Sequence, residues 1–228
     1  IDQAMQRLKT VDALRGQDLQ FTEEGLGKRQ RSTANPRDLA ADWEQLKKEL
    51  NSLSPTAIAS RHRQIRDTIR SMISHAGDTS NLILDPDLDS YYLMDITLLA
   101  LPQTQDRLAD ILSDGHQMLL QEELTAEQRL RLSVLATLLR ESDFDRIVGS
   151  TRTALNEDPN FYGVSPSMQN VESALDSYIS STDRLTTMLD QIATAETTTV
   201  TPEQYEQLVT DAVAGSFQLW KVAAQELD

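Results

Sequence analysis

The amino-acid sequence predicts an all-α protein: an elongated antiparallel helical bundle, arranged as two stacked four-helix bundles that share long helices. Glycine (8) and proline (7) are scarce among the 228 residues, which argues against a β fold with many turns. Aromatic residues make up only 5% of the chain against 39% for all hydrophobic types, so the core must be largely aliphatic. Long helices packed side by side can build such a core. We expect residues 1–228 to form a single helical domain, either one long bundle or two stacked modules.

The helix starts are marked by proline. Five of the seven prolines follow a residue whose side chain can cap a helix: Asn35-Pro36, Ser54-Pro55, Asp85-Pro86, Ser165-Pro166 and Thr201-Pro202. The side-chain oxygen of a cap accepts an unpaired backbone N–H, and proline at the first helical position loses no hydrogen bond. Thr125 with Gln128, and Thr201 with Gln204, also have the spacing of a capping box.

These signals predict three helices in the first third of the chain. The first covers residues 1–24, carries a loose apolar stripe and ends at Gly25 and Gly27. The second covers residues 36–53 and places Leu39, Trp43 and Leu46 on one face. The third covers residues 55–75, with apolar residues at helical spacing.

Four more helices are predicted after residue 85. They cover residues 86–113, 126–152, 166–195 and 202–227. Pro102 is expected to kink the first of these and Gly115 to stop it. The second is expected to pack through Leu130, Val134 and Leu138 and then through Phe144, Ile147 and Val148. The last two carry apolar residues at helical spacing along their whole length.

Charge is unevenly distributed along the chain. The net charge is −15, but residues 1–70 carry 13 Lys+Arg against 10 Asp+Glu, a net of +3, and the remainder carries −18. So acidic a chain is a poor binder of nucleic acid or of an anionic membrane surface. There is no cysteine, which excludes disulfides and thiolate catalysis. No apolar run is long enough to span a bilayer. Since both ends read as helix, we expect the chain to continue at both ends in a longer protein.

Three arginines form a line on the predicted third helix. Arg63, Arg66 and Arg70 stand at positions i, i+3 and i+7, which places them on one face. One interpretation is a solvated face paired with acids of a neighbouring helix. The other is a guanidinium clamp for a carboxylate, nitrate or similar anion, because the planar fork of arginine suits such groups.

The stretch that begins the fourth helix carries the other candidate residues. Asp95 shares a face with Leu88, Tyr92 and Leu99, so we expect it to point inward and to need a partner. The arginines of the third helix are the nearest candidates along the chain. Tyr91 and Tyr92 fit either bundle packing or a ligand contact. An internal ion-pair network and a site for a small polar ligand therefore both remain open.

Catalytic and metal chemistry finds no support in the sequence. The Asp85-x-Asp87-x-Asp89 spacing resembles the opening of a calcium loop, but Ser90 and Ile96 stand where glycine and glutamate are required. The three histidines have no metal-ligand spacing. There is no glycine-rich phosphate loop and no nucleophile motif. We therefore expect no enzyme activity, no metal and no cofactor.

One segment resembles a known family. The sequence SNLILDPDLDSYYLMD (Ser80–Asp95) is similar to a segment of the extracytoplasmic sensor regions of bacterial methyl-accepting chemotaxis proteins and of some sensor kinases. The Leu14-Arg15-Gly16-Gln17 stretch and the terminal Ala-Ala-Gln-Glu-Leu-Asp are similar in style. The resemblance implies a helical bundle of the helical bimodular or nitrate-sensing type. It also implies a periplasmic location between two membrane helices and action as a homodimer.

Two functional hypotheses follow. In the first, the chain is the sensor domain of a transmembrane chemoreceptor. A small polar or anionic molecule binds between helices, contacts Arg63, Arg66, Arg70, Tyr91, Tyr92 and Asp95, and displaces a helix. In the second, the chain is an interaction or dimerisation module of a sensor kinase or receptor that recognises a periplasmic protein. A pocket lined by Arg63, Arg66, Tyr91 and Asp95 would favour the first, and a dry, fully paired core with an exposed apolar patch would favour the second.

Overall fold

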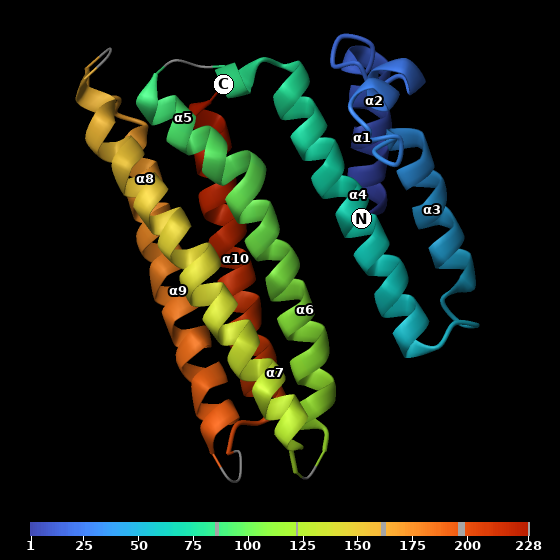
Figure 1. Ribbon diagram of the computed structural model, residues 1–228, viewed down its shortest axis with the longest axis vertical. Coiled ribbons are helices and arrows are strands. Elements are labelled where there is room, and N and C mark those ends of the chain that lie inside the picture. The colour runs from blue at the N-terminus through green and yellow to red at the C-terminus, as the bar shows by residue number, and fades with distance from the viewer. Residues whose placement is uncertain (85–86, 122, 161–162, 196–198, 228) are drawn as a thin grey trace. The chain divides into compact units, whose positions relative to one another are not determined.

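The computed structural model describes residues 1–84, 87–121, 123–160, 163–195 and 199–227. The chain divides into two compact units, Ile1–Leu84 and Asp85–Asp228 (Figure 1). The predicted all-α class is confirmed, since every regular element in the described ranges is helical. No described helix is common to both units, because α4 ends at Thr79 and α5 begins at Leu88. The stacking of two bundles therefore stays a prediction.

The first unit is built on three long helices and a short one. These are α1 (Asp2–Arg15), α2 (Glu23–Lys28), α3 (Pro36–Glu49) and α4 (Pro55–Thr79), followed by the 3₁₀ turn η1 (Leu82–Leu84). Its core joins side chains from all four helices and from the loop before α3: Met5, Leu26, Ala34, Leu39, Trp43, Leu46 and Met72. The Trp43 indole donates to Asp2 over 2.7 Å, which ties α3 to the start of α1.

The predicted first helix, residues 1–24, was wrong in its second half. The helix ends at Arg15, and Gln20 takes a left-handed φ of 54°. Thr22 then caps a new helix, its side chain accepting from the Gly25 N–H. Gly25 therefore lies inside α2 instead of ending a helix. A Cβ at this position would stand 2.3 Å from the Gln20 carbonyl oxygen, so only glycine allows this close approach.

The second unit is an antiparallel four-helix bundle (Figure 1). Its first long helix runs through α5 (Leu88–Asp95), the π-helical segment η2 (Ile96–Ala100) and α6 (Leu101–Leu119). Its second runs through α7 (Ala126–Thr137), the π-helical segment η3 (Leu138–Phe144) and α8 (Asp145–Glu157), ending in the 3₁₀ turn η4 (Asp158–Asn160). The last two are α9 (Met168–Thr194) and α10 (Pro202–Glu226). Each long helix packs against two neighbours, which closes the bundle.

Most of the predicted helix starts are confirmed. Asn35, Ser54, Thr125 and Thr201 each accept a backbone N–H at the start of a helix, and the last two form complete capping boxes. Ser165 is an exception, because α9 begins at Met168 without a side-chain cap. The predicted start at Asp85-Pro86 lies outside the described residues.

The predicted inner face of the helix over residues 126–152 was wrong in its first half and confirmed in its second, where Ile147 and Val148 are buried. Leu130, Val134 and Leu138 are exposed by 64%, 47% and 38%, whereas Leu132, Ala136 and Leu139 are fully buried. Both sets repeat at helical spacing, so periodicity alone could not choose between them. The exposed set forms an apolar stripe along α7 and the start of η3.

Gly115 does not stop its helix, contrary to the prediction. The helix continues to Leu119, and Gly115 gives room to Tyr205 of α10. A Cβ at Gly115 would stand 1.9 Å from the Tyr205 hydroxyl oxygen. That hydroxyl donates to the Ile111 carbonyl over 2.7 Å. The glycine therefore permits a buried bond between α10 and α6.

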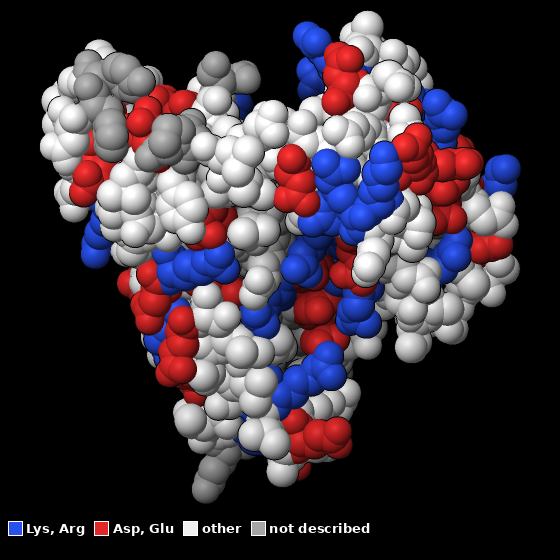
Figure 2. All heavy atoms as spheres, turned by 45° about the horizontal axis from the view of Figure 1, so that its top comes forward, with Lys and Arg blue, Asp and Glu red and all other residues white. Residues whose placement is uncertain are grey.

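None of the helices in the described ranges has the length and apolar character that crossing a membrane requires. Acidic and basic side chains are interspersed over the visible surface of each unit (Figure 2). Several form exposed pairs, such as Arg140 with Asp190 at 2.8 Å. Such pairs contribute at most about 1 kcal/mol each. Stability must therefore come mainly from the buried core.

We expect Gly115→Ala to lower the free energy of unfolding by about 1–3 kcal/mol, because the added methyl group overlaps the Tyr205 ring. Gly149→Ala is the matched control, since nothing lies within 4 Å of its Cβ position in α8. Helix propensity should make the control neutral or stabilising by up to about 1 kcal/mol. Urea unfolding of both variants measures the difference. Equal effects would show that Gly115 is not a packing requirement.

Candidate ligand site

The six residues predicted to bind a ligand come from both units. Arg63, Arg66 and Arg70 lie on α4 of the first unit, Arg63 exposed and the other two half-buried. Tyr91, Tyr92 and Asp95 lie on α5 of the second unit. Neither unit by itself contains the whole predicted set, so the arginine clamp remains a separate hypothesis about α4.

Asp95 has a partner other than the predicted arginines. Arg146 of α8 forms a bidentate ion pair with Asp95: Nη2 lies 2.5 Å from Oδ1 and Nε lies 3.1 Å from Oδ2. The Asp95 side chain is 16% exposed and that of Arg146 is 42% exposed. The expectation that Asp95 needs a cationic partner is confirmed, but the partner is Arg146 and not an arginine of α4, and the pair ties α5 to α8.

The two tyrosines of α5 pack mainly against protein. Their ring centroids are 5.5 Å apart in an edge-to-face arrangement. Tyr92 packs against the core of the bundle, while Tyr91 is 46% exposed. This geometry fits the packing interpretation given for both residues.

The core of the second unit consists of two apolar clusters. One surrounds α5, η2 and α8: Leu93, Ile96, Ala100, Leu101, Ile147, Val148, Ala154, Met168, Val171, Ala174, Leu175, Tyr178, Leu219, Val222 and Ala223. The other surrounds α6 and α7: Leu108, Ile111, Met118, Leu119, Leu124, Leu132, Ala136, Leu139, Leu185, Met188, Leu189, Ile192, Tyr205, Val209 and Ala212. On each of the four long helices, polar residues stand between the two clusters.

We call these intervening residues the polar layer: Thr104, Asp143, Ser181, Thr182 and Ser216, together with the hydroxyl of Tyr178. All are at most 5% exposed. Three of the hydroxyls are satisfied by carbonyls of their own helices, Thr104 by Ala100 at 3.0 Å and Ser181 and Ser216 in the same way. Burying polar groups is costly unless they are hydrogen-bonded. The polar groups that remain, those of Asp143, Thr182 and Tyr178, therefore determine whether the layer could bind a ligand.

Two buried hydroxyls of the polar layer have no hydrogen-bond partner among the described residues, those of Tyr178 and Thr182. Burial is the main reason why the pKa of Tyr178 is raised, and the nearby Asp143 carboxylate raises it further. The hydroxyls of Thr182 and Thr104 lie close to the phenol and lower its pKa, although no well-formed hydrogen bond joins them to it. The phenol is therefore neutral, and it can donate one hydrogen bond and accept another.

Asp143 brings a charge into the layer. It is 2% exposed and accepts from Arg107 Nε of α6 over 2.6 Å and from Arg107 Nη2 over 3.4 Å. Gln103 Nε2 donates to it over 3.4 Å. The Arg107 side chain is 17% exposed, so the pair connects the layer to the rim of the bundle. An arginine that is paired with an acid of the layer, together with two unpaired hydroxyls in the same layer, can recognise a small molecule that has hydrogen-bond acceptors.

The sequence analysis did not predict this site, although one residue of the site, Asp143, could have been recognised from the sequence. Asp143 continues the inward spacing of Leu132, Ala136 and Leu139, and an acid in an apolar stripe is a candidate buried group. Thr104, Ser181 and Thr182 carry no such signal, because threonine and serine are common on every face of a helix.

Two hollows on the surface are weaker candidates for a ligand site than the polar layer. A shallow groove of about 770 Å³ lies between α9 and α10, near Asp183, Gln191 and Glu203. A hollow of about 370 Å³ in the first unit lies between α1, α3 and α4 and has an almost entirely apolar lining. Within the described ranges, none of the residues around either hollow has a buried side-chain atom without a hydrogen-bond partner.

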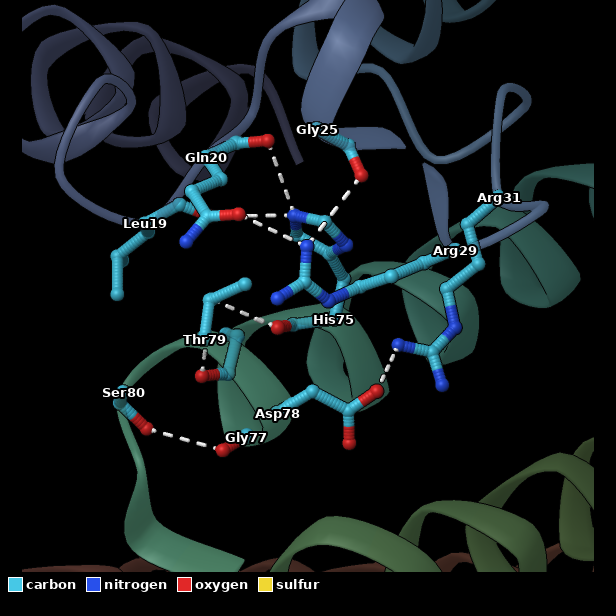
Figure 3. Close-up of polar contacts among 11 residues, drawn as sticks. Leu19, Gln20, Gly25, Arg29, Arg31, His75, Gly77, Asp78, Thr79 and Ser80 are labelled. Atoms are coloured by element: carbon cyan, nitrogen blue, oxygen red, sulfur yellow. Dashed lines mark hydrogen bonds and ion pairs between the residues drawn. The ribbon is translucent and has the colours of Figure 1, made fainter. Parts of the chain in front are cut away.

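The first unit has its own buried polar centre at His75 (Figure 3). The ring is fully buried, and Nε2 lies 3.1 Å from the carbonyl oxygens of both Leu19 and Gln20. Since both are acceptors, Nε2 carries the proton and donates. Arg29 binds the Gln20 side chain at 2.8 Å, and Arg31 pairs with Asp78. His75 thus fastens the loop between α1 and α2 onto α4.

Comparison with models of known protein families, with curated proteins and with solved structures finds no match to this chain.

We expect Thr182→Val to leave the free energy of unfolding unchanged or to raise it by about 1 kcal/mol, because it removes a buried hydroxyl that has no partner. Thr151→Val is the control. Thr151 is equally buried, but it donates to the Ile147 carbonyl over 2.7 Å. Losing that bond should cost about 0.5–1.5 kcal/mol. Urea unfolding compares them, and a larger loss for Thr182→Val would mean that its hydroxyl is already satisfied.

The first unit should lose stability in mild acid because of His75. Burial lowers the pKa of His75 below 6.5, and the charges of Arg29 and Arg31 lower it further, against the opposing carbonyl hydrogen bonds. The unfolded chain therefore binds more protons, and stability falls as the pH drops below about 6.5. His75→Gln keeps a donor but cannot titrate. Urea unfolding of both proteins at pH 7.5 and 5.5, followed by Trp43 fluorescence in a Trp220→Phe background, should show the loss only with His75. Equal losses would contradict this assignment.

Proposed function

We propose that the chain is the ligand-binding sensor domain of a transmembrane chemoreceptor. A small polar or anionic molecule would bind between the helices of the second unit and shift one helix relative to another. The resemblance of Ser80–Asp95 to chemoreceptor sensor regions suggests this role, and the all-helical bundle is compatible with it. In this proposal the domain acts as a homodimer on the periplasmic side of the membrane, anchored by helices that flank it.

The observation that carries the proposal is the pair of open hydroxyls in the polar layer. A core built only for stability would pair such groups or replace them by apolar side chains, because each unsatisfied hydroxyl costs about 1–3 kcal/mol. Tyr178 and Thr182 face each other across one helical turn of α9. A ligand with one donor and one acceptor would complete both, and Arg107 is close to the same layer through Asp143.

A second candidate function is supported by a different observation. The apolar stripe of Leu130, Val134 and Leu138 lies exposed on the outside of the bundle. Such a stripe is typical of a surface that binds another protein or a second copy. A module that recognises a periplasmic protein would use this face and would need no molecule in the polar layer.

A thermal-shift screen against organic acids, amino acids and nitrate tests the proposal. A ligand at 100 times its dissociation constant adds about 2.7 kcal/mol to the folded state, which should raise the midpoint by several degrees. The double variant Tyr178→Phe/Thr182→Val should lose the shift while Thr151→Val keeps it. Loss of the shift in Arg66→Ala alone would place the site at the arginines of α4 instead.

A panel without any hit would contradict small-molecule sensing by this domain. Charge substitutions on the stripe, such as Leu130→Glu/Val134→Glu, then test the alternative. They should abolish dimerisation or capture of a protein partner without changing the helical circular dichroism.

A further inference from the structure

The hollow of the first unit reaches from the solvent into the core. It has a volume of about 370 Å³ and lies between α1, α3 and α4. Met5, Leu39 and Met72 line it from these three helices, and each is also a buried member of the core. Val11 and Ile69 line it from α1 and α4 and are 52% and 37% exposed. A molecule in the hollow would therefore contact the core without any rearrangement of the helices.

The lining of the hollow favours an uncharged, apolar ligand. Of the side chains that line it, those of Asp12 and Arg15 are charged and the others are apolar. Asp12 lies 3.7 Å from Arg37, and Arg15 lies 3.7 Å from Asp18. A charged ligand would have to compete with these ion pairs. Since none of the lining residues has a buried side-chain atom that lacks a hydrogen-bond partner, a ligand needs no polar group to complete the site.

One wall of the hollow is held in place by hydrogen bonds. Phe21 lines the hollow from the loop between α1 and α2, and its ring packs against the His75 ring with centroids 4.6 Å apart. His75 in turn donates to the carbonyls of Leu19 and Gln20 in the same loop. Binding therefore does not have to order this wall, which would otherwise reduce the affinity.

Two methionines make other parts of the lining adaptable. The side chains of Met5 and Met72 are unbranched and polarisable, so they can adjust to apolar molecules of different shape and can contact aromatic rings favourably. A fixed aromatic wall together with methionine side chains suits small aromatic or aliphatic molecules.

The size of the hollow indicates a small molecule and not a helix of another protein. Pockets for small molecules have volumes of about 300–1,000 Å³ and are lined mostly by apolar side chains. A single turn of an α-helix, about 10 Å across and about 5.4 Å long, already takes up roughly 420 Å³. A helix is therefore too large to enter the hollow.

We infer that the first unit binds a neutral, apolar small molecule in the hollow between α1, α3 and α4. Binding is driven by transfer of apolar surface from water onto the lining. The site lies in a different unit from the polar layer and takes a different class of ligand. The inference is therefore independent of the proposed function.

Fluorescence titration of the full chain with N-phenylnaphthylamine tests the inference, because this neutral, apolar dye emits strongly only in apolar surroundings. We expect a saturable rise in dye fluorescence with the parent chain. Ala76→Phe adds a ring to the lining from α4 and should abolish the rise. Ala13→Phe is the control, since it adds the same ring at an exposed position of α1 that does not line the hollow. The control should keep the rise.

Absence of a saturable rise with the parent chain would overturn the inference, and so would an unchanged rise with Ala76→Phe. If Ala76→Phe loses its helical circular dichroism, Ala4→Phe takes its place, because Ala4 lines the hollow from an exposed position of α1. A parent dimer that dissociates in the same variant, measured by sedimentation equilibrium, would assign the hollow to a second copy and would also contradict the inference.

Two further variants establish where the dye binds. Leu130→Glu/Val134→Glu should keep the rise, and its loss there would assign the dye to the apolar stripe of α7 and overturn the inference. Tyr178→Phe/Thr182→Val should also keep the rise, since the polar layer takes no part in this site. A failed ligand screen for the polar layer leaves this test unaffected.

Discussion

The high cost of burying polar groups in a helical core is the constraint on which the second unit depends. The core of this bundle consists of two apolar clusters, and each of the four long helices places a buried serine, threonine or aspartate between the two clusters. Asp143 needs a cation, and Arg107 supplies it from α6. The carbonyl freed next to Pro102 needs a donor, and Trp220 supplies it from α10. Only the hydroxyls of Tyr178 and Thr182 are left open in the layer.

Helix α10 braces the first long helix at two points. Tyr205 donates to the Ile111 carbonyl in one apolar cluster, and Trp220 donates to the Thr97 carbonyl at the border of the other. Both bonds depend on a small or unusual residue opposite, Gly115 in one case and Pro102 in the other. The facing pair, α7–α8, has no corresponding bond from an aromatic side chain among the described contacts.

The fold could be predicted from sequence because helix starts are local signals. Asn35, Ser54, Thr125 and Thr201 were recognised because a cap and its first turn lie within four residues. The inner face of α7 could not be predicted, since Leu130 and Leu132 belong to two equally periodic stripes. The arginine of Asp95 was missed because Arg146 lies 51 residues away in sequence and meets it only through packing.

The candidate site was hidden for a related reason. Thr104 and Thr182 look like ordinary helix residues until the four helices are brought together, and π turns follow no simple sequence pattern unless proline is present. The arginines of α4 and the tyrosines of α5 were visible as motifs, yet the hydroxyls of Tyr178 and Thr182 lie on a different helix, α9. Local sequence signals thus predicted a helical bundle, whereas packing determined which buried hydroxyls lack a hydrogen-bond partner.

The most direct measurement is a crystal structure of the full chain that resolves the polar layer in atomic detail. Our account predicts a small molecule within about 2.6–3.2 Å of both the Tyr178 and the Thr182 hydroxyl oxygens. Its density should disappear in Tyr178→Phe/Thr182→Val. A dry layer, with both hydroxyls bonded to protein groups and nothing between the helices, would contradict the account.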